Sequence, residues 1–165
     1  MYLYDHRYIL TKEKLQRYNV VLLTGGHVPT QNQYFQEIHL KEIIEDFDGI
    51  IIGISAESMN SSQVVYAQSE LSGEATNPNY QRWLTGLNLT NLHILPHYQM
   101  VKDTTLDGLK LFEDITYPDS INHEFLVLED GSYLLIDQEA IVYGKSYLLH
   151  NQKLSFLCKQ SESKK

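Results

Sequence analysis

Ser55 is the first residue whose position suggests chemistry. It lies in the stretch GIIIGISAESMN, after a run of β-branched residues typical of a buried strand and before small residues that could begin a helix. A nucleophilic serine needs such a sharp strand-to-helix turn, with small neighbours because backbone crowds in from both sides. A serine that caps the helix needs the same position, and this stretch alone favours the cap.

A glycine pair, Gly25 and Gly26, follows an earlier predicted strand over residues 20–23. Parallel strands end at one edge of a sheet, where ligands bind in open α/β folds. Glycines there let backbone N–H groups face a developing oxyanion, and the loss of one such donor typically lowers the rate by about 10²–10³-fold. A plain tight turn is the alternative interpretation.

His97 and Asp130 complete the set of residues that could carry chemistry. His97 follows Pro96 at the end of a predicted strand over residues 92–95, which puts it at the same sheet edge as Ser55. Asp130 precedes a glycine, where an aspartate commonly stabilises a turn, and as the third member of a triad it would orient the imidazole. His93 and His97 could both approach a metal, but no carboxylate has suitable spacing, so neither a metal nor a cofactor is expected.

The elements that must position these residues follow from the hydrophobic pattern. The first two thirds predict a strand over 20–23, a helix over 34–47, a strand over 50–52 and a short helix from 55 to about 66. A polar loop over 68–79, the strand over 92–95 and a surface helix over 103–115 follow. The last third predicts short strands separated by turn signals, as in a β-meander, over 125–128, 133–136, 140–144 and 147–149.

The fold class expected from this order is α/β, with a mostly parallel sheet flanked by helices and antiparallel C-terminal strands. The 165 residues fit one domain, 1–165. A formal charge of −8 disfavours nucleic acid as a partner. No apolar run approaches the roughly 20 residues of a membrane span, so no membrane is expected either. Cys158 is the only cysteine, which excludes an internal disulfide and indicates a cytoplasmic location.

Four motifs in order carry a family resemblance: LTGGHVPTQNQYF, GISAESMNS, ILPHY and LEDGSYLLI. They resemble the peptidase E/cyanophycinase family of serine peptidases, whose fold is similar to the three-layer, flavodoxin-like fold of class I glutamine amidotransferases. The resemblance places a family core over residues 18–150. It leaves residues 1–17 as a remnant N-terminal segment and residues 156–165 as a flexible tail.

The resemblance implies a role for each candidate residue. Ser55 would attack the scissile carbonyl of a short peptide and form an acyl-enzyme, as in a dipeptidase. His97 would act as general base and then general acid, with Asp130 orienting its ring. The oxyanion hole would consist of the backbone N–H groups of Gly25, Gly26 and Ala56.

Glu57 is the main departure from the family pattern, which has a second glycine at this position. A side chain there would crowd the turn, and its carboxylate would oppose negative charge in the oxyanion hole. It would also stabilise the imidazolium and so raise the pKa of His97. These effects define an alternative function, in which a catalytically impaired homologue serves as a binding or assembly module.

Other departures concern the N-terminus and specificity. Family members have further βα units ahead of the glycine-pair strand, and the uncovered sheet edge expected here leads to the hypothesis of a homodimer. Peptidase E selects an N-terminal aspartate with an arginine, for which Lys102 and Lys110 are no convincing replacement because a surface helix also needs lysines. A glutamine amidotransferase is disfavoured, since its nucleophile is a cysteine and Cys158 lies near the tail.

Overall fold

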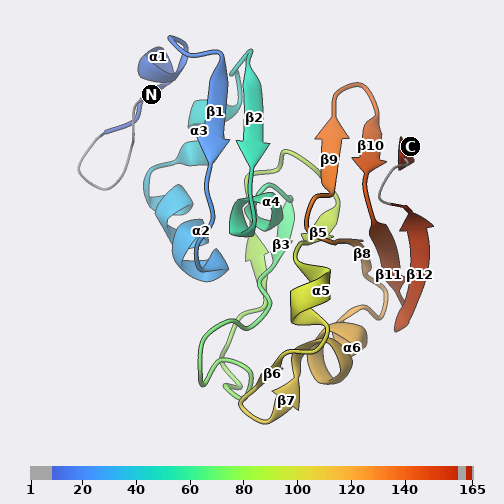
Figure 1. Ribbon diagram of the computed structural model, residues 1–165. Helices are drawn as coiled ribbons and strands as arrows, with labels where there is room; N and C mark the ends of the chain where they lie inside the picture. The colour runs from blue at the N-terminus through green and yellow to red at the C-terminus, as the bar shows by residue number, and fades with distance from the viewer. Residues whose placement is uncertain (1–8, 160–162, 165) are drawn as a thin grey trace.

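The computed structural model describes residues 9–159 and 163–164, which form a mixed α/β fold (Figure 1). The helices are α1 (Lys12–Leu15), α2 (Val28–Glu37), α3 (Leu40–Ile44), α4 (Ala56–Asn60), α5 (Tyr98–Val101), the π-helix η1 (Leu111–Thr116) and α6 (Tyr117–Asp119). The strands are β1 (Val20–Leu23), β2 (Ile50–Gly53), β3 (Val64–Tyr66), β4 (Trp83–Thr85), β5 (His93–Leu95), β6 (Thr105–Leu106), β7 (Leu109–Lys110), β8 (Glu124–Leu128), β9 (Tyr133–Ile136), β10 (Ala140–Tyr143), β11 (Ser146–His150), β12 (Lys153–Cys158) and β13 (Ser163–Lys164).

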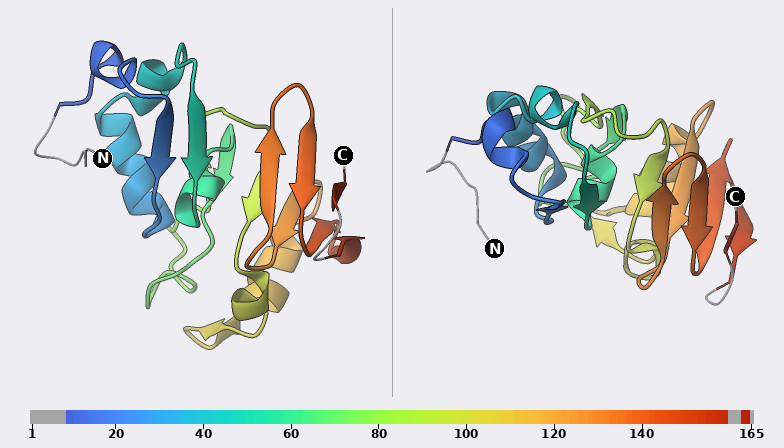
Figure 2. Two further views of the ribbon diagram at one scale, coloured as in Figure 1. Left: turned by 45° about the horizontal axis from the view of Figure 1, so that its top comes forward. Right: turned by 90° about the horizontal axis from the view of Figure 1, so that it is seen from above.

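Strands β1 and β2 form a parallel pair, one face of which is covered by the helices that the structure describes. Residues such as Val21 and Ile51 point to α1, α2 and α3 and join a core cluster with Phe35 and Leu40. Figure 2 shows these helices on one side of the two strands. The other face is apolar and between 43% and 62% exposed; we call it the β1–β2 face, and it consists of Val20, Leu22, Ile50 and Ile52.

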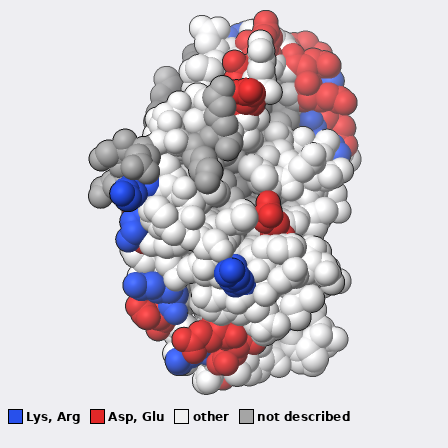
Figure 3. Space-filling view, turned by 90° about the vertical axis from the view of Figure 1, so that its right-hand side faces the viewer, with Lys and Arg blue, Asp and Glu red and all other residues white. Residues whose placement is uncertain are grey.

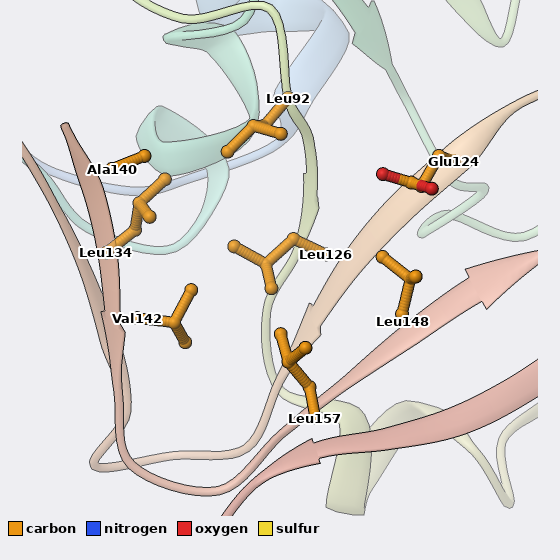
Figure 4. A pocket seen from close by; sticks show the side chains of 8 residues that line it. All are labelled: Leu92, Glu124, Leu126, Leu134, Ala140, Val142, Leu148 and Leu157. Carbon is orange, nitrogen blue, oxygen red and sulfur yellow. The ribbon is translucent and has the colours of Figure 1, made fainter. Parts of the chain in front are cut away.

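A second sheet has the strand order β12-β11-β8-β5, in which only β5 and β8 are parallel. The main core lies against this sheet and includes Phe125, Val127 and Leu149, each fully buried. Strands β9, β10 and β13 form a separate antiparallel sheet. Between β9–β10 and the second sheet lies a pocket of about 250 Å³ (Figure 4). It is lined by Leu92, Glu124, Leu126, Leu134, Ala140, Val142, Leu148 and Leu157.

The sheet therefore differs from the mostly parallel one expected. In the described part of the chain the two parallel pairs, β1–β2 and β5–β8, belong to separate sheets, and the remaining pairings between strands are antiparallel. Helix α4 packs against both β2 and β5. The sequence pattern showed that each strand was apolar, but it could not show which strands pair.

All three helices predicted from the sequence are wrong in extent or type. The helix expected over 34–47 is two helices, α2 and α3, because His39 adopts a left-handed conformation at φ 53°. The helix expected from 55 to about 66 ends at Asn60 and is followed by β3. The segment 103–115 forms the β6–β7 hairpin and part of η1 instead of a surface helix, since Asp107 and Gly108 both take positive φ at the turn.

The first residues of the predicted tail over 156–165 belong to a strand. Strand β12 includes residues 156–158, and Cys158 at its end is 1% exposed. At the other end of the chain, Leu15 in α1 is buried against α3 and so joins the N-terminal segment to the core. Residues 1–8, 160–162 and 165 of the two predicted terminal segments lie outside the described residues.

Charged side chains on the face formed by the C-terminal strands lie in small groups of both signs, between wide uncharged areas (Figure 3). Basic residues form no continuous patch on the described part of this face. Among the described residues, no helix has the length and apolar character needed to cross a membrane.

Candidate functional site

Ser55 lies on a strained turn between β2 and α4. Its backbone has φ 61° and ψ −121°, a conformation that L-residues rarely adopt and that persists only where the surroundings enforce it. Ile54 N–H donates to Leu23 O at 3.1 Å, and Ser58 N–H donates to Ser55 O at 2.9 Å, so hydrogen bonds fix both sides of the turn. The Ser55 side chain makes no cap hydrogen bond to α4. The helix-capping role is therefore wrong.

Two glycines give this turn the space it needs. A Cβ on Gly53 would lie 3.0 Å from the carbonyl oxygen of Glu57, because α4 begins directly over the end of β2. A Cβ on Gly25 would lie 2.9 Å from Ser55 Cβ. The glycine pair after β1 is thus packed against the serine, as expected from two neighbouring parallel strands that end at one edge.

His97 and Asp130 lie in line with Ser55. His97 Nε2 is 2.9 Å from Ser55 Oγ, and His97 Nδ1 is 2.5 Å from Asp130 Oδ1. With the proton on Nδ1, the ring donates to the carboxylate and presents the Nε2 lone pair to the serine hydroxyl. The structure brings together three side chains from the ends of β2, β5 and β8.

In the turn after β8, Asp130 contacts His97, whereas its neighbour Glu129 has other partners. Asp130 N–H donates to Gln99 Oε1 at 3.0 Å, which ties the turn to α5 beside His97. Glu129 instead accepts from Lys145 Nζ and from Tyr147 Oη, both at 2.8 Å, and the Lys145 hydrogen bond lowers the pKa of this carboxyl. Gln99 could not be identified from the sequence, because a glutamine two residues after a histidine carries no recognisable signal.

The backbone N–H groups of Gly25, Gly26 and Ala56 donate to no group within the described residues. The Gln31 side chain folds back from α2, where its Nε2 donates to Thr24 O at 3.1 Å and lies over Gly26. The position predicted for an oxyanion hole thus has unused donors next to the serine.

Glu57 behaves differently from the charged group expected at this position. Its side chain is in the interior, 1% exposed, and its Oε2 has no hydrogen-bond partner among the described residues. Burial raises the pKa of Glu57 to about 8, so the carboxyl is mostly neutral at pH 7. A neutral acid brings no net negative charge near the hole, and the main electrostatic objection to catalysis is removed.

Other candidate residues lie elsewhere or have other contacts. His93 Nδ1 lies 2.9 Å from Val64 O and its ring makes an edge-to-face contact with Trp83, so it does not join His97. No cluster of three or more metal-ligating side chains occurs in the part of the chain that the structure describes. Lys110 forms an exposed ion pair with Glu113 at 2.7 Å.

Comparisons with known proteins identify the family of the chain. The profile of peptidase family S51 matches residues 5–143, so the chain belongs to this family, the peptidase E family, as its motifs predicted. No curated protein matches the chain. Among the solved structures that match is a candidate peptidase E from Listeria monocytogenes EGD-e, with 17% identity and a TM-score of 0.48. The match covers 92% of this chain and 64% of that one, so this chain spans less than two thirds of its length.

Proposed function

We propose that the chain is a serine peptidase that hydrolyses short peptides, with Ser55 as nucleophile, His97 as general base and acid, and Asp130 as the group that orients His97. The observation that carries the proposal is the pair of contacts at His97, 2.9 Å to Ser55 Oγ and 2.5 Å to Asp130 Oδ1. A structural histidine has no need of a strained serine on one nitrogen and a carboxylate on the other.

In the first half of the reaction, Ser55 Oγ attacks the scissile carbonyl carbon while His97 Nε2 takes the hydroxyl proton. The carbonyl oxygen becomes an oxyanion that the N–H groups of Gly25, Gly26 and Ala56 are available to bind. The tetrahedral intermediate then collapses, the C–N bond breaks, and the leaving amine takes the proton from His97. An ester between Ser55 and the acyl part of the peptide remains.

Water resolves the ester by the reverse use of the same groups. His97 removes a proton from the attacking water, and a second tetrahedral intermediate forms at the same carbon. Its collapse breaks the bond to Oγ, which regains a proton from His97, and releases the carboxylic acid. Dipeptidase-like specificity and the three-layer architecture of class I glutamine amidotransferases belong to this proposal as implications of the family.

The remaining expectations about the chain's surroundings also belong to the proposal. They are a cytoplasmic location, a short peptide as substrate, and no nucleic acid, membrane, cofactor or metal as partner. The formal charge of −8 and the single, buried thiol of Cys158 support them.

Covalent labelling tests the proposal directly. An activated phosphonate ester, which reacts with serine nucleophiles, should label the wild type at Ser55 and should not label Ser55→Ala. Ser155→Ala, which removes an exposed serine on β12, serves as the matched control and should label like the wild type. A folded wild type that resists labelling would contradict catalysis and favour the binding or assembly module.

A further inference from the structure

An acidic turn over residues 70–75 contacts the residues that directly follow the glycine pair, Gly25 and Gly26. His27 follows Gly26 and begins α2, and its Nδ1 lies 2.8 Å from Thr30 Oγ1. Its Nε2 lies 2.9 Å from Glu74 Oε1, with the two side chains 20% and 16% exposed. The contact lacks hydrogen-bond geometry, so it is a close approach of the ring nitrogen to the carboxylate.

Glu74 is itself rigidly placed. Its Oε2 accepts from the backbone N–H groups of Glu70 at 2.9 Å and Leu71 at 3.0 Å. The following segment is fixed by Asp107 from the β6–β7 hairpin, which accepts from Gly73 N–H at 2.8 Å and Ala75 N–H at 3.1 Å. The turn over residues 70–75 therefore holds Glu74 in a fixed position beside the His27 ring.

A second contact joins the same turn to the start of α2. Glu70 Oε1 accepts from Val28 N–H at 3.3 Å. Burial raises the pKa of Glu70, and the nearby His27 and His97 partly oppose that rise. The turn thus contacts two consecutive residues directly after the glycine pair.

We propose that Glu74, acting through His27, is a positioning residue that holds the Gly25–Gly26 loop in place for oxyanion binding. This inference rests on the proposed function. His27 has two tasks in it: it anchors the loop, and its ring nitrogen partners the Glu74 carboxylate, which would otherwise face the loop without this partner. Removal of His27 leaves that carboxylate without its ring partner, whereas Glu74→Gln removes the carboxylate itself.

This difference predicts an unusual pattern in a double-mutant cycle. Two quantities are measured for labelling with the activated phosphonate. One is the maximal rate of the covalent step, and the other is the phosphonate concentration at which labelling reaches half of that rate. His27→Asn should lower the maximal rate by about tenfold or more. This loss is smaller than the one expected when an N–H donor of the oxyanion hole is removed outright. The half-saturating concentration should change little. Glu74→Gln should lower it by a few fold, and the double variant should match Glu74→Gln alone.

The controls separate this inference from the proposed function. Glu113→Gln removes a distant carboxylate of the same type, paired with Lys110 at 2.7 Å, and should label like the wild type. Thr30→Val removes only the second partner of the His27 ring and provides a milder variant should His27→Asn fail to fold. Unchanged maximal rates in the single variants, or losses that simply add in the double variant, would overturn the positioning role. A wild type that does not label at all would overturn the proposed function itself.

Discussion

At the scale of single residues, charge state matters more than residue type. Glu57 suggested a negative charge beside the oxyanion hole, but burial keeps its carboxyl mostly neutral near pH 7. Asp130 is more exposed, with 60% of its side chain accessible, and it contacts His97. Two carboxyl groups near one site therefore have different roles because their surroundings differ.

Glu57 should make the stability of the protein fall as pH rises. Its pKa is about 8 in the folded chain against 4.5 for an ordinary glutamate, so the folded state binds more protons between these values. The stabilisation is complete below about pH 4.5 and is lost as pH rises through 8. The free energy of unfolding is measured with denaturant for the wild type and Glu57→Gln at pH 5 and pH 9. Between these pH values it should fall by on the order of 3 kcal/mol more in the wild type than in Glu57→Gln. Parallel losses in both proteins would refute this account.

Asp130→Asn should slow labelling of Ser55 by about 10²–10⁴-fold, because an amide can hold His97 in the wrong tautomer. Its neighbour provides a matched control: Glu129→Gln removes a carboxylate that contacts Lys145 and Tyr147 instead of His97. This control should keep the wild-type labelling rate. Equal rates for Asp130→Asn and Glu129→Gln would exclude Asp130 from the triad.

At the scale of elements, the site depends on how closely α4 approaches β2. The conformation of Ser55 is maintained by this approach, which leaves no space for a Cβ on Gly53 or Gly25. The hydrophobic pattern predicted β1, β2, β5 and β8 well, since buried strands have a clear signal. It failed for the segment 103–115, where apolar residues at helical spacing belong to a hairpin and a π-helix.

Gly53→Ala tests this close approach. The new methyl group would lie 3.0 Å from Glu57 O and 3.1 Å from Ser61 Oγ, so α4 must shift. We expect the free energy of unfolding to fall by about 1–3 kcal/mol and labelling of Ser55 to slow strongly. Gly108→Ala is the comparison: it adds backbone strain at φ 84° in a hairpin, but meets no atom within 4 Å. That variant should lose stability while labelling at the wild-type rate.

At the scale of the whole molecule, the structure differs most from an α/β fold with both sheet faces covered at the β1–β2 face. Parallel sheets are normally covered on both faces, yet four apolar side chains here are 43% to 62% exposed. The face has no charged residue, although the chain has a formal charge of −8. Two copies could therefore meet across it without bringing like charges together, which supports the homodimer as a proposal.

Light scattering at micromolar concentration tests the homodimer. The wild type should have the mass of a dimer, and Leu22→Asp should be monomeric because it places a charge on the β1–β2 face. Leu71→Asp changes an equally exposed leucine in a loop, 54% against 51%, and should remain dimeric. A monodisperse wild-type monomer, or dissociation of both variants, would argue against this face as the contact.

The sequence by itself determined the family, the candidate residues of the site and most of the strands. Each of these depends on local signals: glycines before and beside a serine, a histidine after a strand, and a carboxylate in a turn. Their order along the chain was enough to connect Ser55, His97 and Asp130. Only the tertiary structure gave the distances between them, since these depend on how β2, β5 and β8 are placed.

The tertiary structure also decided what no local pattern could show. Strand pairing, the division into separate sheets, the raised pKa of Glu57 and the contact between His27 and Glu74 all depend on residues distant in sequence. Burial and electric charge are properties of the surroundings of a side chain, and those surroundings exist only once the chain has folded. The sequence therefore names the residues that could act, and the fold sets the charge and position with which each of them does so.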